Sequence, residues 1–197
     1  MKAGNVQYQA LIQIIKTRIP HTHLHSEQVA GYAVALAKAT ELPSKQINAI
    51  HISALLHDVG KLGVPDEILT KTEDLTAEEF LQMQLHCIMG EEILNRFSTF
   101  TEEAKVARYH HERWDGEGYP DGLIGEEIPL AARIIHLADS IDAMLQPRHY
   151  KNAYPLDWVL GEIYRCGGSQ FDPNMVELAL DWLRDDGLSL RPVAQAA

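Results

Sequence analysis

Histidines are frequent in this sequence and stand in clusters that could bind metal ions. The 197-residue chain contains ten of them, at positions 21, 23, 25, 51, 57, 86, 110, 111, 136 and 149. Imidazole nitrogens and carboxylate oxygens that meet in one pocket are common ligands of divalent transition metals. His57 and Asp58, followed by Lys61, form the strongest local pattern. Taken alone, this pair could equally be a histidine at a helix C-terminus beside a capping aspartate, so the metal hypothesis depends on other positions.

The spacing of further residues predicts that they lie at one end of a helical bundle. His25 and His57 lie 15 and 14 residues on either side of the turn at residues 40–43, so two antiparallel helices would place both side chains together. Further ligand positions follow at intervals of 29, 24 and 28 residues, each about the length of a helix pair: His86, the pair His110 and His111, and Asp139. Together with Asp58, these side chains suit two octahedral ions that share a bridging carboxylate.

The types of ligand narrow the choice of metal. A mixture of imidazole and carboxylate without thiolate favours iron or manganese, with zinc, nickel or cobalt as alternatives. Cys87 and Cys166 form no Cys-x-x-Cys pair, which excludes a cysteine-rich structural zinc site, and both are expected to be ordinary helix residues. For any one histidine, a hydrogen-bonded core or surface position is the commoner outcome, so only their joint arrangement supports a metal site.

Composition limits the class of protein that must position these residues. The chain is 46% apolar and 23% charged, which favours one domain with a substantial core. Its formal charge of −11 would repel DNA and RNA, whereas a small phosphate ligand stays compatible if bound metal ions reverse the sign locally. No apolar run is long enough for a membrane helix and the start lacks a signal peptide, so we expect no membrane contact and a cytoplasmic protein.

Helical periodicity dominates, and no run of alternating β-branched residues occurs, so we expect an all-α fold. The expected helices are Val6–Ile19, His25–Thr40, Ser44–Val59, Thr76–Phe97 with Gly90 as the candidate break, one capped by Thr101 that reaches His111, Pro129–Leu145, Pro155–Cys166 and Asp172–Asp186. Residues 112–128, rich in Gly, Asp and Pro, predict a long ordered loop. We divide the chain into an N-terminal helix or linker stub (1–20), a main domain (21–186) and a C-terminal tail (187–197).

Three motifs resemble those of HD-GYP domains in the HD phosphohydrolase superfamily. They are HDVGK at 57–61, HHERWDGEGYP at 110–120 and ADSIDA at 138–143. Flanking matches are HSEQVA at 25–30, the histidine at 86, RHY at 148–150 and GSQFDP at 168–173. The resemblance spans about residues 22 to 185. It implies a compact multi-helix HD-domain bundle with a long GYP loop and no significant β-sheet.

The resemblance also implies a ligand set. One metal ion would be held by His25, His57, Asp58 and Asp139, and a second by His86, His110 and His111, with Asp58 bridging the two. Some members bind a third ion through a glutamate four residues before the first histidine. Here that position is His21, so a two-metal centre is the better prediction.

The implied activity is that of a cyclic di-GMP phosphodiesterase, which opens the dinucleotide to pGpG and in some members continues to GMP. A metal-bound hydroxide would attack the phosphodiester, with Asp58 and Lys61 as catalytic residues and Lys61 facing the scissile phosphate. Arg148 would bind a phosphate oxygen, although a surface ion pair is an equal alternative for it. Alternative functions are a phosphodiesterase for another cyclic dinucleotide and a non-catalytic cyclic di-GMP sensor or protein-docking module.

The GYP loop raises alternatives of its own. Tyr119 would bind substrate by lining the guanine pocket, or contact a diguanylate cyclase (GGDEF) domain, the partner proposed for this loop in the family; inward packing is the structural alternative. Trp114 is expected to be a core residue. Asp142 is expected to orient a ligand histidine, and His136 to pack or to support the site. A homodimer through the first helix is left open.

Overall fold

Within the residues that can be described, the chain consists of helices and loops. The computed structural model describes residues 3–147 and 153–185, and in these ranges no strand forms, although an isolated bridge pairs Gly167 with Phe171. The all-α prediction is confirmed. The helices are α1 (Ala3–Arg18), α2 (Pro20–Ala39), α3 (Ser44–Leu56), η1 (Val59–Gly63), α4 (Asp66–Leu69), α5 (Ala77–Gln84), α6 (His86–Leu94), α7 (Thr101–Tyr109), η2 (Gly125–Glu127), α8 (Leu130–Leu145), α9 (Leu156–Arg165) and α10 (Pro173–Asp185).

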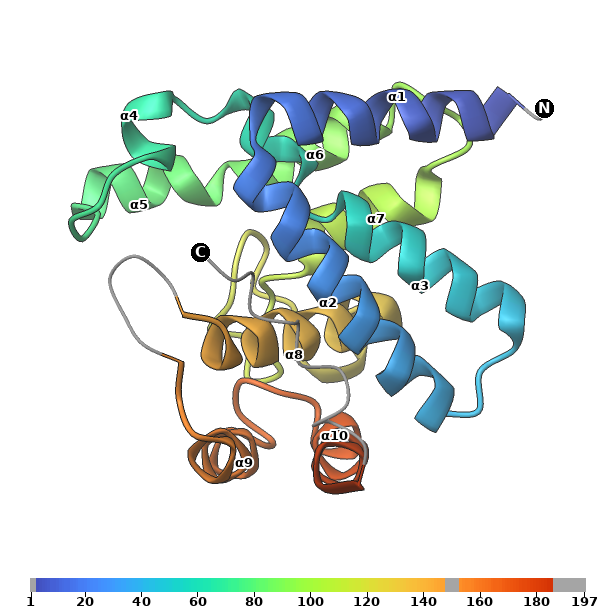
Figure 1. The fold of residues 1–197 in the computed structure, drawn as a ribbon, viewed down its shortest axis with the longest axis vertical. Helices are drawn as coiled ribbons and strands as arrows, with labels where there is room; N and C mark the ends of the chain where they lie inside the picture. Colours follow the sequence, from blue (N-terminus) through green and yellow to red (C-terminus); the bar gives the residue numbers. More distant parts are fainter. Residues whose placement is uncertain (1–2, 148–152, 186–197) are drawn as a thin grey trace, which may run out of the picture.

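Helix α2 crosses the middle of the molecule and organises its packing. It contacts α3 and α8 along its length, and α10 near the lower end of the view in Figure 1. Helices α9 and α10 lie below α8, and α1 runs across the opposite end above α6 and α7. Among the described helices, none is both long and apolar enough to cross a membrane. Segments far apart in sequence therefore meet around α2.

Two hydrophobic clusters hold these helices together. The larger one joins α2, α3 and α8 to α9 and α10, and small residues such as Ala33 and Ala37 let α2 lie close to its neighbours. The smaller one places Leu11 and Ile15 of α1 against residues of α3, η1, α6 and α7. Both α1 side chains are almost fully buried, which fits a packing helix rather than a linker stub.

A close backbone contact between η1 and α6 positions the end of α3. A Cβ atom added to Gly60 would lie 1.9 Å from the carbonyl oxygen of His86 and 2.5 Å from the backbone nitrogen of Gly90. Such a contact is possible only without a side chain, since the obstacles are backbone atoms that cannot turn away. Gly60 thus brings the segment after α3 directly against the start of α6.

Two expected helix boundaries around the first site residues are wrong. Helix α2 begins at Pro20 and not at His25, because proline in the first turn needs no hydrogen-bond donor and so starts one helix directly after α1 ends. Helix α3 ends at Leu56 and not at Val59, where the chain tightens into the 3₁₀ helix η1. His57 and Asp58 consequently lie in the turn that joins α3 to η1.

Two further expectations about helix ends are also wrong. The helical region that follows the capping box of Thr76 and Glu79 breaks at Leu85 and not at Gly90. Gly90 stays helical. Its lack of a side chain lets α6 lie close to η1 and α7. Thr101 does not cap α7, because Phe100 occupies the N-cap position. The remaining helices begin and end close to their expected residues.

Candidate metal centre

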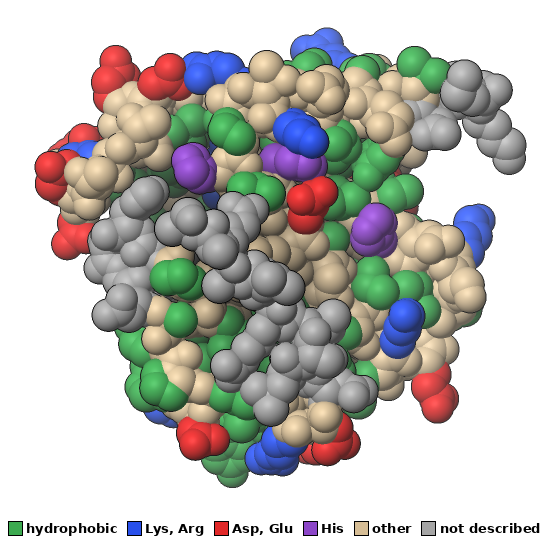
Figure 2. Space-filling view, viewed as in Figure 1, with side chains coloured by type: hydrophobic (Ala, Val, Ile, Leu, Met, Phe, Trp, Pro, Cys, Tyr) green, Lys and Arg blue, Asp and Glu red, His purple; other side chains and the backbone are tan. Residues whose placement is uncertain are grey.

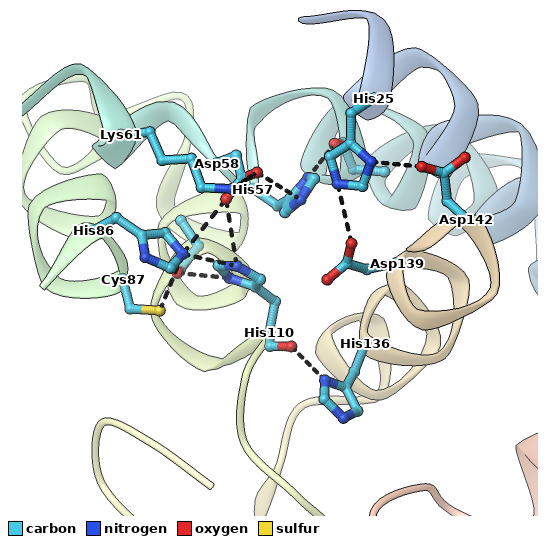
Figure 3. A network of polar contacts seen from close by, with 12 residues as sticks. His25, His57, Asp58, Lys61, His86, Cys87, His110, His136, Asp139 and Asp142 are labelled. Carbon is cyan, nitrogen blue, oxygen red and sulfur yellow. Dashed lines mark hydrogen bonds and ion pairs between the residues drawn. The ribbon is translucent and has the colours of Figure 1, made fainter. Parts of the chain in front are cut away.

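The structure brings all the predicted metal ligands together from five parts of the chain. His25 comes from α2, His57 and Asp58 from the end of α3, His86 from the start of α6, His110 and His111 from the end of α7, and Asp139 from α8. Figure 3 shows His25, His57, His86, His110 and Asp139 around the carboxylate of Asp58. Within the described part of the chain, two groups of ligand atoms each lie within 4.8 Å of one another: His86, Cys87, His110 and His111, and separately His25, His57 and Asp58.

Three of the histidines are held in the same way by the ends of helices. The Nδ1 atoms of His57, His86 and His110 lie 2.7, 2.6 and 2.9 Å from the carbonyl oxygens of residues 54, 83 and 107, each three positions earlier. Carbonyls at helix C-termini lack a partner within the helix, so these contacts satisfy them. A proton on Nδ1 leaves Nε2 as the acceptor, which is the tautomer that binds a metal ion through Nε2.

Asp58 lies at the centre of the cluster. Its Oδ2 atom accepts a hydrogen bond of 2.5 Å from Lys61 and lies 3.4 Å from Nε2 of His57. Its Oδ1 atom lies 3.4 Å from Nε2 of His86 and 3.8 Å from Nε2 of His110, yet has no hydrogen-bond partner although it is buried. Burial alone would raise the pKa of Asp58, but the charges of Lys61 and His57 hold it well below its usual range. A buried carboxylate oxygen without a partner fits a cation ligand.

Two carboxylates, those of Asp139 and Asp142, hold His25. Its Nε2 atom lies 3.0 Å from Asp139 Oδ1, and its Nδ1 atom lies 2.7 Å from Asp142 Oδ2. The histidine that Asp142 orients is therefore His25. Burial alone would lower the pKa of His25, but hydrogen bonds to Asp139 and Asp142 outweigh it and raise the pKa to about 9.

The raised pKa of His25 predicts a pH-dependent metal affinity. In the metal-free protein at neutral pH, a proton occupies the Nε2 atom that a metal ion would need, so binding must release it. We expect the affinity for Mn²⁺ to rise as the pH is raised from neutrality toward 9, as measured by titration of chelator-treated protein. Asp142→Asn should weaken this dependence, because one of the two carboxylates that raise the pKa is lost. An affinity unchanged over this pH range would contradict the assignment.

The pKa values of the histidine pair after α7 are shifted in the opposite direction. Burial lowers the pKa of His111 to about 3 and that of His110 well below its usual range. The His111 ring stacks on Tyr119, with ring centroids 4.9 Å apart. Tyr119 therefore packs against a candidate ligand of the metal centre.

Glu112, which the sequence analysis did not single out, fixes the GYP loop. Its buried carboxylate accepts hydrogen bonds from the backbone N–H groups of Asp121, Gly122 and Leu123, at 2.7, 3.1 and 3.1 Å. The only available signal was an acidic residue directly after the histidine pair and before a glycine-rich loop. These bonds hold the loop in the fold that places Tyr119 against His111.

Cys87 and His136 also have contacts that were not foreseen. Cys87 is fully buried, and its Sγ atom lies 3.6 Å from Nε2 of His86, so it belongs to the ligand cluster and is not an ordinary helix residue. Its position next to His86 was the available signal. His136 donates from Nδ1 to the carbonyl oxygen of His110 at 2.8 Å, and thus supports the backbone of a ligand, one of the two roles considered for it. Burial raises the pKa of Cys87 and lowers that of His136.

Three further residues considered in the sequence are not placed in the ligand groups by the described structure. Arg148 falls outside the described residues. His21 and His23 lie on α2 one and three positions after its first residue, and neither belongs to the two ligand groups within the described ranges. On the face drawn in Figure 2, histidine side chains reach the surface near acidic and basic side chains.

The donor set fits divalent metal ions. Imidazole nitrogens, two carboxylates whose pKa values lie well below their usual range, and an unpartnered oxygen of Asp58 form one cluster. Among the described residues, the partners of the buried Asp58 carboxylate are Lys61 and imidazole groups. The cluster is therefore a candidate site for two ions, shared through Asp58.

Comparison with known proteins agrees with this geometry. The HD-domain family matches residues 9–175. The protein named "Cyclic di-GMP phosphodiesterase" from Thermotoga maritima is 40% identical over 174 residues, which cover 87% of this chain and 47% of that protein. The "3'3'-cGAMP-specific phosphodiesterase 2" of Vibrio cholerae is 38% identical over 184 residues, which cover 92% of this chain and 35% of that protein. The chain thus spans less than half the length of either relative.

A solved structure shares the fold at lower sequence identity. The HD domain of the L. monocytogenes phosphodiesterase PgpH, in complex with cyclic-di-AMP, has a TM-score of 0.65 and 18% identity, and the match covers 95% of this chain and 98% of that one. The family match covers most of the chain, and the matched segment contains every predicted metal ligand. The chain therefore belongs to the HD-domain family, consistent with the resemblance of its motifs to HD-GYP domains.

Proposed function

We propose that this chain is a metal-dependent phosphodiesterase that hydrolyses cyclic di-GMP to pGpG, with GMP as the product of any second cleavage. The observation that carries the proposal is the buried, ionised Asp58 between two groups of imidazoles, with Lys61 beside it. The name of the T. maritima relative, which is 40% identical, supports the same substrate. In this proposal the chain is an enzyme of cyclic dinucleotide signalling.

The ligand sets suggest which residues hold each ion. His25, His57, Asp58 and Asp139 would hold the first ion, and His86, His110 and His111 the second, with Asp58 between them. The oxygen and nitrogen ligands of the first set favour iron or manganese, with zinc, nickel or cobalt as alternatives. When bound, such ions acidify water and neutralise the charge of a phosphodiester. A third ion near His21 is the less favoured arrangement.

The chain's own residues would bind and orient the substrate. Lys61 is partly exposed, and its ammonium group lies against Asp58, so it can hold this carboxylate and face a phosphate oxygen at once. Arg148 would position another phosphate oxygen through its planar guanidinium group. Tyr119 is flanked by His111 and by Phe80, whose ring centroid lies 6.4 Å away, and its ring would stack on a guanine base.

Tyr119 provides a test of substrate binding that is separate from metal binding. We expect Tyr119→Ala to raise KM by roughly tenfold or more, since stacking between a base and an aromatic ring is worth about 1–3 kcal/mol. Metal content should not change, because Tyr119 is not among the ligands. Tyr119→Phe keeps the ring and should behave like the unaltered protein in steady-state kinetics. Loss of the metal ions from Tyr119→Ala, or an unchanged KM, would show that the residue does not have this role.

The proposed activity is tested by supplying cyclic di-GMP to metal-loaded protein and identifying the products by mass spectrometry. We expect about two first-row ions per chain and pGpG or GMP as product. The same assay with 3'3'-cGAMP tests a second candidate substrate, suggested by the 38% identical V. cholerae relative. Full metal loading without hydrolysis of any cyclic dinucleotide would overturn the enzyme proposal and favour a sensor or docking module.

Two protein–protein interactions belong to the same proposal. A diguanylate cyclase (GGDEF) domain would have to contact the outer side of the GYP loop, for example at the exposed Ile124, because the Tyr119 ring lies on His111. A homodimer would use the exposed side of α1, where Val6 and Ile14 are 58% and 50% exposed. Light scattering with and without a GGDEF domain would measure both associations.

A further inference from the structure

The second ligand group contains a sulfur atom that the proposed mechanism does not use. Cys87 follows His86 in α6 and is fully buried. In Figure 3 its sulfur points toward the imidazoles of the centre rather than away from them. Its Sγ atom and the ligand atoms of His86, His110 and His111 all lie within 4.8 Å of one another. A thiol is therefore placed where a fourth ligand of this group would lie.

Two separations between these atoms match the spacing of ligands around one zinc ion. Zinc binds imidazole nitrogen at about 2.0–2.1 Å and thiolate sulfur at about 2.3 Å, so two tetrahedral ligands lie about 3.3 Å apart for N and N, and about 3.6 Å apart for N and S. The Nε2 atoms of His86 and His110 are 3.3 Å apart, and Nε2 of His86 is 3.6 Å from Sγ of Cys87. Both separations therefore fit ligands of a single ion.

A second observation is an unpartnered carboxylate oxygen that faces this group. Oδ1 of Asp58 is buried, has no hydrogen-bond partner and lies 3.4 Å from Nε2 of His86. The Asp58 side chain is 2% exposed, so solvent does not satisfy this oxygen. Cys166 lies elsewhere in the fold. Its Sγ atom lies 3.6 Å from Glu162 at the end of α9, and it belongs to neither ligand group.

We propose that Cys87 is a thiolate ligand of the second metal ion, together with His86, His110 and His111, and that this set selects zinc or cobalt over iron or manganese. Thiolate favours softer ions, whereas the first set keeps only nitrogen and oxygen ligands, so the two ions differ in kind. On binding, the sulfur–metal bond replaces the S–H bond and the proton passes to solvent. The inference rests on the proposed two-metal centre and deepens it.

Cobalt substitution tests the thiolate directly, because bonding between thiolate and Co²⁺ produces intense near-ultraviolet absorption that nitrogen and oxygen ligands do not. We expect this band in the Co²⁺-loaded unaltered protein and in Cys166→Ser, and its loss in Cys87→Ser. Competition with a chelator should show that Cys87→Ser binds Zn²⁺ at least about tenfold more weakly. Bound Co²⁺ without the band, or a band that persists in Cys87→Ser, would overturn the proposal.

X-ray absorption on the unaltered zinc protein covers the case in which Cys87→Ser does not fold. We expect one sulfur neighbour of zinc at about 2.3 Å. Zinc surrounded by nitrogen and oxygen alone would refute the role of Cys87 and leave the two-metal centre standing. A protein that retains no metal ion would refute both.

Discussion

Replacing Asp58 with alanine should remove both metal ions and lower turnover of cyclic di-GMP by at least about a thousandfold, equivalent to about 4 kcal/mol. The reason is its position: one carboxylate oxygen lies near His57 and Lys61, and the other faces His86 and His110. Metal analysis and product formation, measured on the same sample, check both effects.

Two further variants separate charge from shape in this experiment. Asp58→Asn keeps the shape of the side chain but removes its charge, and we expect it to fold and still to lose the ions. Asp157→Ala removes an exposed carboxylate at the start of α9 and should retain both ions and full turnover. If the Asp58→Ala protein kept two ions per chain, the assignment of Asp58 as the shared ligand would be refuted.

Gly60→Ala should be among the most damaging substitutions outside the ligand set. The added methyl group would lie 1.9 Å from the carbonyl oxygen of His86, so η1 and α6 would have to separate. We expect a loss of about 3 kcal/mol in the free energy of unfolding, typical of overpacking against an immobile backbone. For a domain of this size, this lowers Tm by about 6–12 °C. Thermal denaturation of chelator-treated protein measures the effect without the stabilisation that bound metal ions add.

Gly31→Ala provides the matched control. Gly31 lies within α2, and a Cβ atom added there meets nothing within 4 Å. Alanine at this position should stabilise the protein by about 0.5–1 kcal/mol, because glycine in a helix costs more conformational entropy. If both variants had the same stability, the close contact between η1 and α6 would not constrain the fold as described.

The close contact at Gly60 also links the stability of the protein to metal binding. Separation of η1 from α6 would move Asp58 and Lys61 away from His86, since these residues flank the contact. The Gly60→Ala protein should therefore bind metal ions more weakly as well as unfold earlier. Metal titration of the folded variant at low temperature would detect this second effect.

Local signals in the sequence determined most helices and the identity of the candidate ligands. Pro173 at the start of α10, the Thr76–Glu79 capping box and the apolar periodicity of α8 all act within a few residues, so they can be recognised without tertiary structure. The motifs at residues 57–61, 110–120 and 138–143 indicated five of the candidate ligands in the same way. The break at Leu85 and the uninterrupted helix at Gly90 could not be predicted, because they depend on which helix packs against Gly90.

The sequence by itself determined the types of ligand and their order along the chain, together with an all-helical fold. Only the tertiary structure decided which ligand faces which: that Asp142 holds His25, that Glu112 ties the loop that carries Tyr119, and that Cys87 joins the histidines around Asp58. These pairings join residues from separate helices and loops or depend on side-chain direction. Residue type and spacing specify which chemistry is available, whereas the packing of α2, α6, α7 and α8 sets the distances over which hydrogen bonds and metal bonds form.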